Sequence, residues 1–333
     1  MISIWRNLPL KAKIGAVVFG VFLLIAIFGP MFQPYDPGFA PPDATKSLNH
    51  PSAAHLLGTT QLGQDVLSQL LTGIRLTMIV ALSVGAIATV LSVLVGVTAA
   101  FLGGVWDEVL SLLTNVFLVV PALPLLIVLL GYLSSQGQLS TIIVLAFLGW
   151  PWGARVIRAQ TLTIRNRDFI AASRESGEQT WRIVTFEIIP NEISLIVANF
   201  VNTVLYAIGA SVALAFAGIA NLESFSLGTI LYWAQDNNAL EGGNWWWWIP
   251  PGLAVAFIGT SLVLLNSGID EIGNPRLRAS RGSAKIAGRR VWTTDPTPVL
   301  GQLTASRSRF GTFVHSFSRS SLLDETPVGG ELR

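Results

Sequence analysis

Six long apolar runs constrain this chain more than any other feature of its sequence. A helix needs about 20 apolar residues to cross the roughly 30 Å hydrocarbon core of a bilayer. Runs that meet this demand lie at residues 14–33, 76–102, 108–133, 139–158, 194–220 and 246–268. Inside a bilayer the chain must satisfy its own backbone polar groups, which favours helices for runs of this length. We therefore predict an all-α, polytopic membrane protein with six transmembrane helices.

The composition argues against several other classes of protein. Of the 333 residues, 51% are hydrophobic and only 12% are charged, whereas an ordinary soluble domain has about 25% charged residues. The formal net charge of +2 is too small to suggest nucleic-acid binding. The chain contains no Cys, which excludes a thiolate metal site, and His50, His55 and His315 are isolated from one another. We predict no metal site.

The distribution of Lys and Arg between the runs predicts the orientation of the chain. One set of flanks is rich in basic residues, at 6–13, 155–182 and 276–285. The opposite set contains only Lys46 and Arg75. Because short basic flanks stay on the cytoplasmic side of a membrane, we expect both termini and the segment 165–191 to be cytoplasmic.

The segment 165–191, "RNRDFIAASRESGEQTWRIVTFEIIPN", is charged and helix-patterned; we call it the helical loop. Burying its four Arg at mid-membrane would cost on the order of 10 kcal/mol, so it is not a seventh span. Positions at i, i+3 and i+7 predict two short amphipathic helices, with Phe169, Ala172 and Ser176 on the first and Trp181, Val184 and Ile188 on the second. Gly177 is expected to form the turn, and Pro190 to end the second helix. Such a hairpin either docks on a partner protein or lies on the membrane surface.

The sequence lacks the groups that catalysis or ion coupling would need. No Gly-Lys pair is followed by Ser or Thr, so the chain has no phosphate-binding loop of that type. The six runs contain no Asp, Glu, Lys or His in their interiors, which disfavours a proton- or sodium-coupled transporter. We predict that the chain is not an enzyme, has no catalytic residues and binds no cofactor itself.

Two further patterns leave alternatives open. Asn199, Asn202 and Tyr206 fall at i, i+3 and i+7 in the fifth run, where they either line a translocation path or hydrogen-bond to neighbouring helices; we favour the second. The run "GNWWWWIPPG" at 243–252 is typical of an aromatic belt at the membrane interface. A stacking platform is the alternative, although consecutive helical residues point in different directions.

The helical loop also resembles a known motif. "AASRESG" followed by "EIIPN" is similar to the cytoplasmic signature loop of binding-protein-dependent ABC importer permeases. The matching residues are Ala172, Gly177, Ile189 and Pro190. Ala171 stands where Glu is typical, Ser173 where Ala is typical, and Glu187 where an apolar residue is typical. Glu175, Glu178 or a partner permease are alternative sources of the missing acidic charge.

The resemblance extends over roughly residues 1–280. "HLLGTTQLGQDVLSQLLTGIRLT" resembles the stretch after the first span in the C-type subunit of the dipeptide/oligopeptide (nickel) permease family, with Thr60 and Gln64 replacing the usual Asp and Arg. The segments "FLGGVWDEVLSLLTNVFLVVPALPLLIVL" and "NPRLR" are similar to later parts of that family. The resemblance implies a type I ABC importer permease fold with cytoplasmic coupling helices between spans 4 and 5. Composition and pattern predict an anchor span with an external loop and an interfacial helix (1–75) and, because it is rich in Ser, Arg and Gly and lacks periodicity, a disordered cytoplasmic tail (279–333). The segment between them, 76–278, is the expected core permease domain.

The resemblance implies the function as well. The chain is expected to form, with a second homologous permease, a path for peptides delivered by an extracytoplasmic solute-binding protein in a prokaryotic cell membrane. ATP and Mg²⁺ would be held by two cytoplasmic ABC ATPase subunits. The residues expected to couple to the ATPases are Phe169, Ala171, Ala172, Ser173, Arg174, Gly177, Trp181, Ile188 and Pro190. Oligosaccharides or chelated nickel are alternative substrates, and a passive channel or carrier, or a scaffold without transport, are alternative classes.

Overall fold

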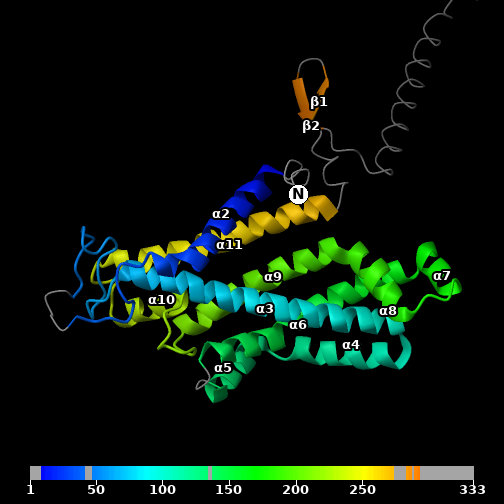
Figure 1. Cartoon of the computed structure of the whole chain (residues 1–333), viewed down its shortest axis with the longest axis horizontal. Helices are drawn as coiled ribbons and strands as arrows, with labels where there is room; N and C mark the ends of the chain where they lie inside the picture. Colours follow the sequence, from blue (N-terminus) through cyan, green and yellow to red (C-terminus); the bar gives the residue numbers. More distant parts are fainter. Residues whose placement is uncertain (1–8, 42–46, 134–136, 274–282, 287–288, 293–333) are drawn as a thin grey trace, which may run out of the picture. The chain divides into compact units, whose positions relative to one another are not determined.

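The computed structural model describes residues 9–41, 47–133, 137–273, 283–286 and 289–292. The chain divides into two compact units, Met1–Gly273 and Asn274–Arg333. The described helices of the first unit are α2 (Leu10–Phe28), η1 (Gly29–Met31), α3 (Val66–Leu102), α4 (Gly104–Val119), α5 (Ala122–Leu133), α6 (Gln138–Arg165), α7 (Asp168–Glu175), α8 (Thr180–Ile183), the π-helical η4 (Val184–Ile188), α9 (Ile189–Phe216), α10 (Leu227–Asp236) and α11 (Trp245–Gly273). Figure 1 shows α3 and α6 side by side, with α4 next to them and the α2–α11 pair on the other side of α3.

The second unit adds two short strands to an otherwise helical fold. Its described residues form strands β1 (Ser283–Ile286) and β2 (Arg289–Trp292). They pair antiparallel, with Ser283 opposite Trp292 and Ile286 opposite Arg289. The remainder of the tail, predicted to be disordered over 279–333, lies outside the described residues.

The predicted membrane spans are present, but the third is bent. Among the described residues, five helices are long and apolar enough to cross a membrane: Leu10–Met31, Val66–Leu102, Gln138–Arg165, Thr180–Phe216 and Trp245–Ile269. The run at 108–133 is instead two helices, α4 and α5, that meet at 88°. Pro121 lacks the N–H that would continue α4, and it disfavours helical geometry at the preceding residue, so Val120 is extended (φ −66°, ψ 128°). The polytopic helical fold is confirmed, with a broken span in place of a straight one.

Helix α3 begins ten residues before the predicted run. The side chain of Asp65 accepts a hydrogen bond from the backbone N–H of Ser68 (2.8 Å) and so caps the helix at its first turn. The 37 residues of α3 span about 55 Å, which is longer than a bilayer core. The predicted interfacial helix before residue 76 is therefore the first part of α3, continuous with the span.

Small residues allow the central helices to approach closely. A Cβ added to Gly96 of α3 would lie 2.7 Å from the carbonyl oxygen of Ala154 in α6. A Cβ added to Gly153 would lie 2.5 Å from both the Asn199 Oδ1 and the Ser92 Oγ. Because hydrocarbon supplies no hydrophobic driving force between helices, such close backbone packing is a main source of their association. These contacts hold α3, α6 and α9 together as the centre of the bundle.

The end of the bundle opposite α7 and α8 is covered by a compact layer (Figure 1). We call this layer, made of the loop 47–65, α10 and the segment 237–247, the cap. Its buried core contains Val66, Ile230, Ala234, Ala239, Trp246 and Trp247. Trp246 is 1% exposed, and its Nε1–H donates to the carbonyl oxygen of Thr59 (3.2 Å). The aromatic-belt interpretation is wrong for Trp246 and Trp247, because both indoles are buried inside the cap (1% and 3% exposed); Trp245 is 49% exposed.

Candidate functional site

The helical loop turns at Gly177, as predicted. Helix α7 ends in two backbone bonds, from the Gly177 N–H to the Arg174 carbonyl (3.1 Å) and from the Glu178 N–H to the Ser173 carbonyl (3.1 Å). This pair of bonds is the Schellman arrangement, which requires a left-handed residue, and Gly177 has φ +78°. A Cβ added to Gly177 would meet nothing within 4 Å, so the backbone conformation alone demands glycine there.

The second helix of the loop does not end at Pro190. Helix α8, η4 and α9 follow one another without a break, and the span runs continuously from Thr180 to Phe216. Pro190 lies in the first turn of α9, where its missing N–H cannot bond back along the helix. The wider π turn immediately before it accommodates this defect. The side-chain amide of Asn191 donates to the carbonyl oxygen of Glu187 (2.6 Å) and satisfies part of the disrupted ladder.

A buried isoleucine cluster anchors the helical loop to the bundle. Ile170, Ile183 and Ile188 are each 2% exposed or less. They pack with Val97, Phe101, Ile157 and Ile164 at the ends of α3 and α6. Ile188 was predicted to share an outward face with Trp181, but the π turn between them changes the angular spacing, and Trp181 is 59% exposed. Ile188 therefore holds the loop in place and is not part of its outer surface.

The outer surface of the loop is aromatic. Phe169 and Trp181 are 44% and 59% exposed, and Phe186, which the sequence did not single out, is 64% exposed. The rings of Trp181 and Phe186 lie edge to face with centroids 6.2 Å apart. The other predicted coupling residues line this surface or its base: Ala171, Ala172, Arg174 and Pro190 are exposed and Ser173 is half-buried. One sequence feature could have pointed to the exposure of Phe186. Pro190 follows it by four residues, and a proline at that distance favours a distorted turn in the helix.

Polar contacts stiffen the loop. The Ser173 hydroxyl donates to the Glu187 Oε1 (2.7 Å), joining the two helices of the loop. These two residues are both departures from the importer signature pattern, and the structure shows that they are partners. The Arg174 guanidinium lies over the Phe101 ring (4.7 Å to the centroid), which ties α7 to the end of α3.

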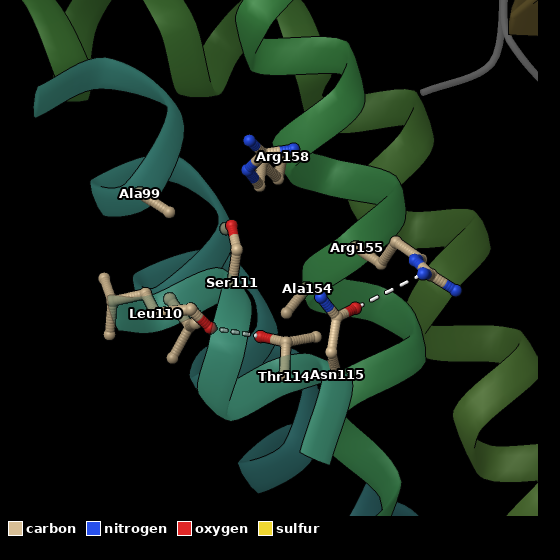
Figure 2. A pocket seen from close by; sticks show the side chains of 10 residues that line it. Ala99, Leu110, Ser111, Thr114, Asn115, Ala154, Arg155 and Arg158 are labelled. Atoms are coloured by element: carbon tan, nitrogen blue, oxygen red, sulfur yellow. Dashed lines mark hydrogen bonds between the residues drawn. The ribbon is translucent and has the colours of Figure 1, made fainter. Parts of the chain in front are cut away.

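Two arginines of α6 tie the α3–α4 turn to the same region. The Arg158 guanidinium donates to both carboxylate oxygens of Asp107 in α4 (2.6 and 2.7 Å). Arg165 donates to the carbonyl oxygen of Ala100 in α3 (2.8 Å). An adjacent cavity of about 140 Å³ lies between α3, α4 and α6. Figure 2 shows side chains that line it, with Arg158 near Ser111 and Arg155 hydrogen-bonded to Asn115 (3.3 Å). The start of α4 is thus connected to the helix that leads into the helical loop.

The Asp107–Arg158 pair is expected to contribute measurably to stability. Their side chains are 23% and 34% exposed, so an unpaired charge is poorly solvated there. Asp107→Asn and Arg158→Gln should each lower the free energy of unfolding by about 2 kcal/mol, between the values for exposed and buried pairs. The charge-swapped double variant Asp107→Arg/Arg158→Asp should recover most of that loss, as measured by thermal unfolding in detergent. The Arg182–Glu178 pair (3.2 Å), in which Arg182 is 60% and Glu178 34% exposed, is the more solvated control, and Glu178→Gln should cost less than about 0.5 kcal/mol. A double variant as unstable as the sum of the singles would contradict the pairing.

The predicted path residues lie on one side of α9 in different surroundings. Asn199 is 8% exposed and packs against Gly153 of α6. Asn202 is exposed and accepts a hydrogen bond from Asn266 of α11 (3.3 Å). Tyr206 is 38% exposed. The contacts of Asn199 and Asn202 support helix–helix packing, whereas the Tyr206 side chain remains partly exposed.

Some polar residues were not anticipated from the sequence. Glu192 lies in the first turn of α9, just before the predicted run, and is 1% exposed; its Oε1 accepts from the Thr161 hydroxyl (2.8 Å). His55 and Asp65 contact each other in the cap (2.9 Å). Within the described ranges, no three His, Cys, Asp or Glu side chains are grouped as metal ligands.

Comparison with known proteins identifies the family. Residues 88–279 match the family described as "Binding-protein-dependent transport system inner membrane component". Residues 11–51 match the N-terminal transmembrane domain of oligopeptide transport permease C. The first match covers more than half of the chain. The chain belongs to this family. It is a permease component of a binding-protein-dependent transport system, as the resemblance of the C-type segments predicted, and not a self-contained channel or scaffold.

Several relatives align along most of their length. The oligopeptide transport system permease protein OppC of Bacillus subtilis (strain 168) is 28% identical over 288 residues, which are 83% of this chain and 91% of the relative. The dipeptide permease protein DppC of the same organism is 29% identical over 280 residues (82% and 85%). The di/tripeptide permease protein DppC of Pseudomonas aeruginosa (strain UCBPP-PA14) is 29% identical over 277 residues (80% and 89%).

Proposed function

We propose that this permease imports peptides as part of an ATP-driven transporter. The relatives named above are permeases for oligopeptides, dipeptides or di/tripeptides, which supports peptides over oligosaccharides or chelated nickel. The complete transporter would contain a second homologous permease, two cytoplasmic ATPase subunits that hold ATP and Mg²⁺, and an extracytoplasmic solute-binding protein. The basic flanks favour a cytoplasmic helical loop and cytoplasmic termini, with the cap outside.

The observation that carries this proposal is the aromatic outer surface of an otherwise anchored helical loop. Phe169, Trp181 and Phe186 are 44–64% exposed, although the same segment buries Ile170, Ile183 and Ile188 against the bundle. Exposed aromatics on an anchored helical hairpin are typical of a surface that inserts into a groove of a partner. The expected groove is on the ATPase subunit, because this chain has no phosphate-binding loop of its own.

Movement of the helical loop would reach the spans through the contacts described above. The isoleucine cluster joins the loop to α3 and α6, and Arg158, Arg165 and Arg174 connect it to the α3–α4 turn. Closure of the ATPases would displace the loop and carry the start of α4 with it. The 88° bend between α4 and α5 is the expected hinge, because the extended Val120 and the missing Pro121 N–H interrupt the helix there.

Reconstitution of the whole transporter tests the proposal. Proteoliposomes that contain both permeases and both ATPases should take up a radiolabelled tripeptide only when ATP and the peptide-loaded binding protein are supplied. A non-hydrolysable ATP analogue should give no net accumulation. Accumulation driven by an ion gradient in the absence of ATP would overturn the proposed function.

Trp181→Ala should weaken the contact with the ATPases. An interface tryptophan that fills a groove is commonly worth 2 kcal/mol or more, so the dissociation constant for the ATPase should rise about 30-fold. Titration of purified ATPase onto the permease in nanodiscs measures this change. Trp106→Ala is a matched control, because Trp106 is 61% exposed but lies on α4 and outside the loop. An equal effect of both variants would argue against docking through the loop.

A further inference from the structure

A cavity of about 770 Å³ opens between the cap ends of α9, α10 and α11. This volume lies within the range of about 300–1,000 Å³ that is typical of small-molecule sites. One part of its lining is apolar and includes Phe216, Leu231 and Trp248. The polar side chains in the lining are those of Gln235, Asn238 and Glu241. No Lys, Arg or His contributes to the described lining.

The three polar side chains are exposed, and none has a protein partner within the described part of the chain. None of its residues hydrogen-bonds or ion-pairs with the side chains of Gln235, Asn238 or Glu241. Each amide can both donate and accept, and the carboxylate accepts only. A ligand that satisfies all three would combine a cationic donor with a nearby amide-like group, and an anionic ligand would find no counter-charge.

The cavity also continues the open face of α9. Tyr206, Gly209 and Ala213 follow one another at i, i+3 and i+7 and are exposed on that helix. Gly209 and Ala213 line the cavity, and Tyr206 lies one turn further towards the helical-loop end. A molecule leaving the cavity along α9 would therefore pass the small Gly209 and Ala213 and then meet the half-exposed Tyr206 ring.

We propose that this cavity receives the amino-terminal end of a short peptide. The Glu241 carboxylate would pair with the peptide's ammonium group, Gln235 and Asn238 would hydrogen-bond to its first peptide group, and the apolar lining would bury a side chain. The inference rests on the proposed peptide transport and adds a site for the substrate on this chain. A lipid acyl chain or a side chain of the second permease would fill the same cavity without needing Glu241.

The absence of Cys from the chain allows a direct test. Ala213→Cys places a single thiol in the cavity, and its rate of maleimide labelling is followed in the complete transporter in nanodiscs. A concentration series of tri-alanine, without binding protein, should slow the labelling. N-acetyl-tri-alanine should need about fivefold higher concentrations, the factor for a partly exposed ion pair of about 1 kcal/mol. Leu253→Cys, on the exposed face of α11 and outside the cavity lining, should label equally with and without peptide.

The role of Glu241 is tested in the same Ala213→Cys background. Glu241→Gln should make the two peptides equally effective, whereas Glu223→Gln, a change at an exposed carboxylate outside this cavity, should preserve the fivefold difference. Labelling that tri-alanine never slows, or slows equally in Glu241→Gln and its parent, would overturn the proposal. The proposal would also be overturned if the thiol of Ala213→Cys reacted with maleimide in the isolated chain but was blocked in the assembled complex.

ATP-driven uptake in the same preparation separates this site from the proposed function. Uptake without protection of the introduced thiol overturns only the cavity as a peptide site. If the unaltered transporter shows no ATP-driven peptide uptake, the proposed function itself is overturned.

Discussion

Replacing Gly177 with proline is expected to abolish peptide uptake while leaving the chain in the membrane. Gly177 has φ +78°, whereas a proline ring fixes φ near −65°. Proline would also remove the N–H that donates to the Arg174 carbonyl. The turn between α7 and α8 must then reorganise, and the exposed aromatics of the loop lose their relative placement. The spans do not depend on this turn, so insertion and yield should stay close to normal.

The measurement is ATP-dependent uptake together with the amount of ATPase that co-purifies with the permease. Gly177→Ala should fall between the parent and the proline variant, since a Cβ in the left-handed region costs about 1–2 kcal/mol. Gly243→Pro is a matched control, because Gly243 has φ +72°, also donates to a backbone carbonyl (Leu240, 3.3 Å) and also has open space around it. It lies in the cap, so its variant should keep normal ATPase binding. Normal uptake by Gly177→Pro would refute the coupling role of the loop.

Truncation of Trp246 is expected to destabilise the cap more than any other single change in it. The side chain is 1% exposed, its Nε1–H bonds the Thr59 carbonyl (3.2 Å), and its ring contacts His50 with centroids 4.4 Å apart. A Cβ on Gly58 would lie only 2.7 Å from the indole, so the loop closes tightly over it. Trp246→Ala should lower the free energy of unfolding by about 3–5 kcal/mol, the usual cost of deleting a buried large aromatic.

Thermal unfolding and binding of the solute-binding protein both report this loss. Trp245→Ala is the neighbouring control, because Trp245 is 49% exposed and should cost less than about 1 kcal/mol. Trp246→Phe separates the hydrogen bond from the packing and should cost about 1 kcal/mol for the lost bond plus a smaller packing loss. If Trp245→Ala and Trp246→Ala were equally mild, the aromatic-belt interpretation would regain support.

The sequence predicted the parts of this fold that depend on local composition and spacing. Apolar runs of sufficient length identified the five spans of the described residues and the bent third one, because only a helix satisfies the backbone polar groups of such a run within hydrocarbon. The turn at Gly177 was predictable because a left-handed residue strongly favours glycine. Family-like motifs over most of the chain predicted a C-type permease, and the matches over residues 11–51 and 88–279 confirm it.

Other features were beyond local reasoning. Ile188 and Trp181 share a face only if the helix keeps 3.6 residues per turn, and the π turn before Pro190 breaks that rule. Four consecutive Trp give no periodicity from which to separate the buried Trp246 from the exposed Trp245. The pairs Ser173–Glu187 and Asp107–Arg158 join residues 14 and 51 positions apart, and no spacing rule within one helix reaches so far.

The sequence by itself determined that the chain spans a membrane as helices, where those helices lie and where the helical loop turns, because each depends on hydrophobicity or backbone geometry within a few residues. The tertiary structure decided which faces of those helices are buried, which side chains remain open to partners and where the third span bends away. Those outcomes depend on contacts between segments distant in the chain: α3 and α6 meet through Gly96 and Gly153, and the cap loops close over Trp246. Packing of this kind follows from three-dimensional complementarity, which a one-dimensional pattern does not encode.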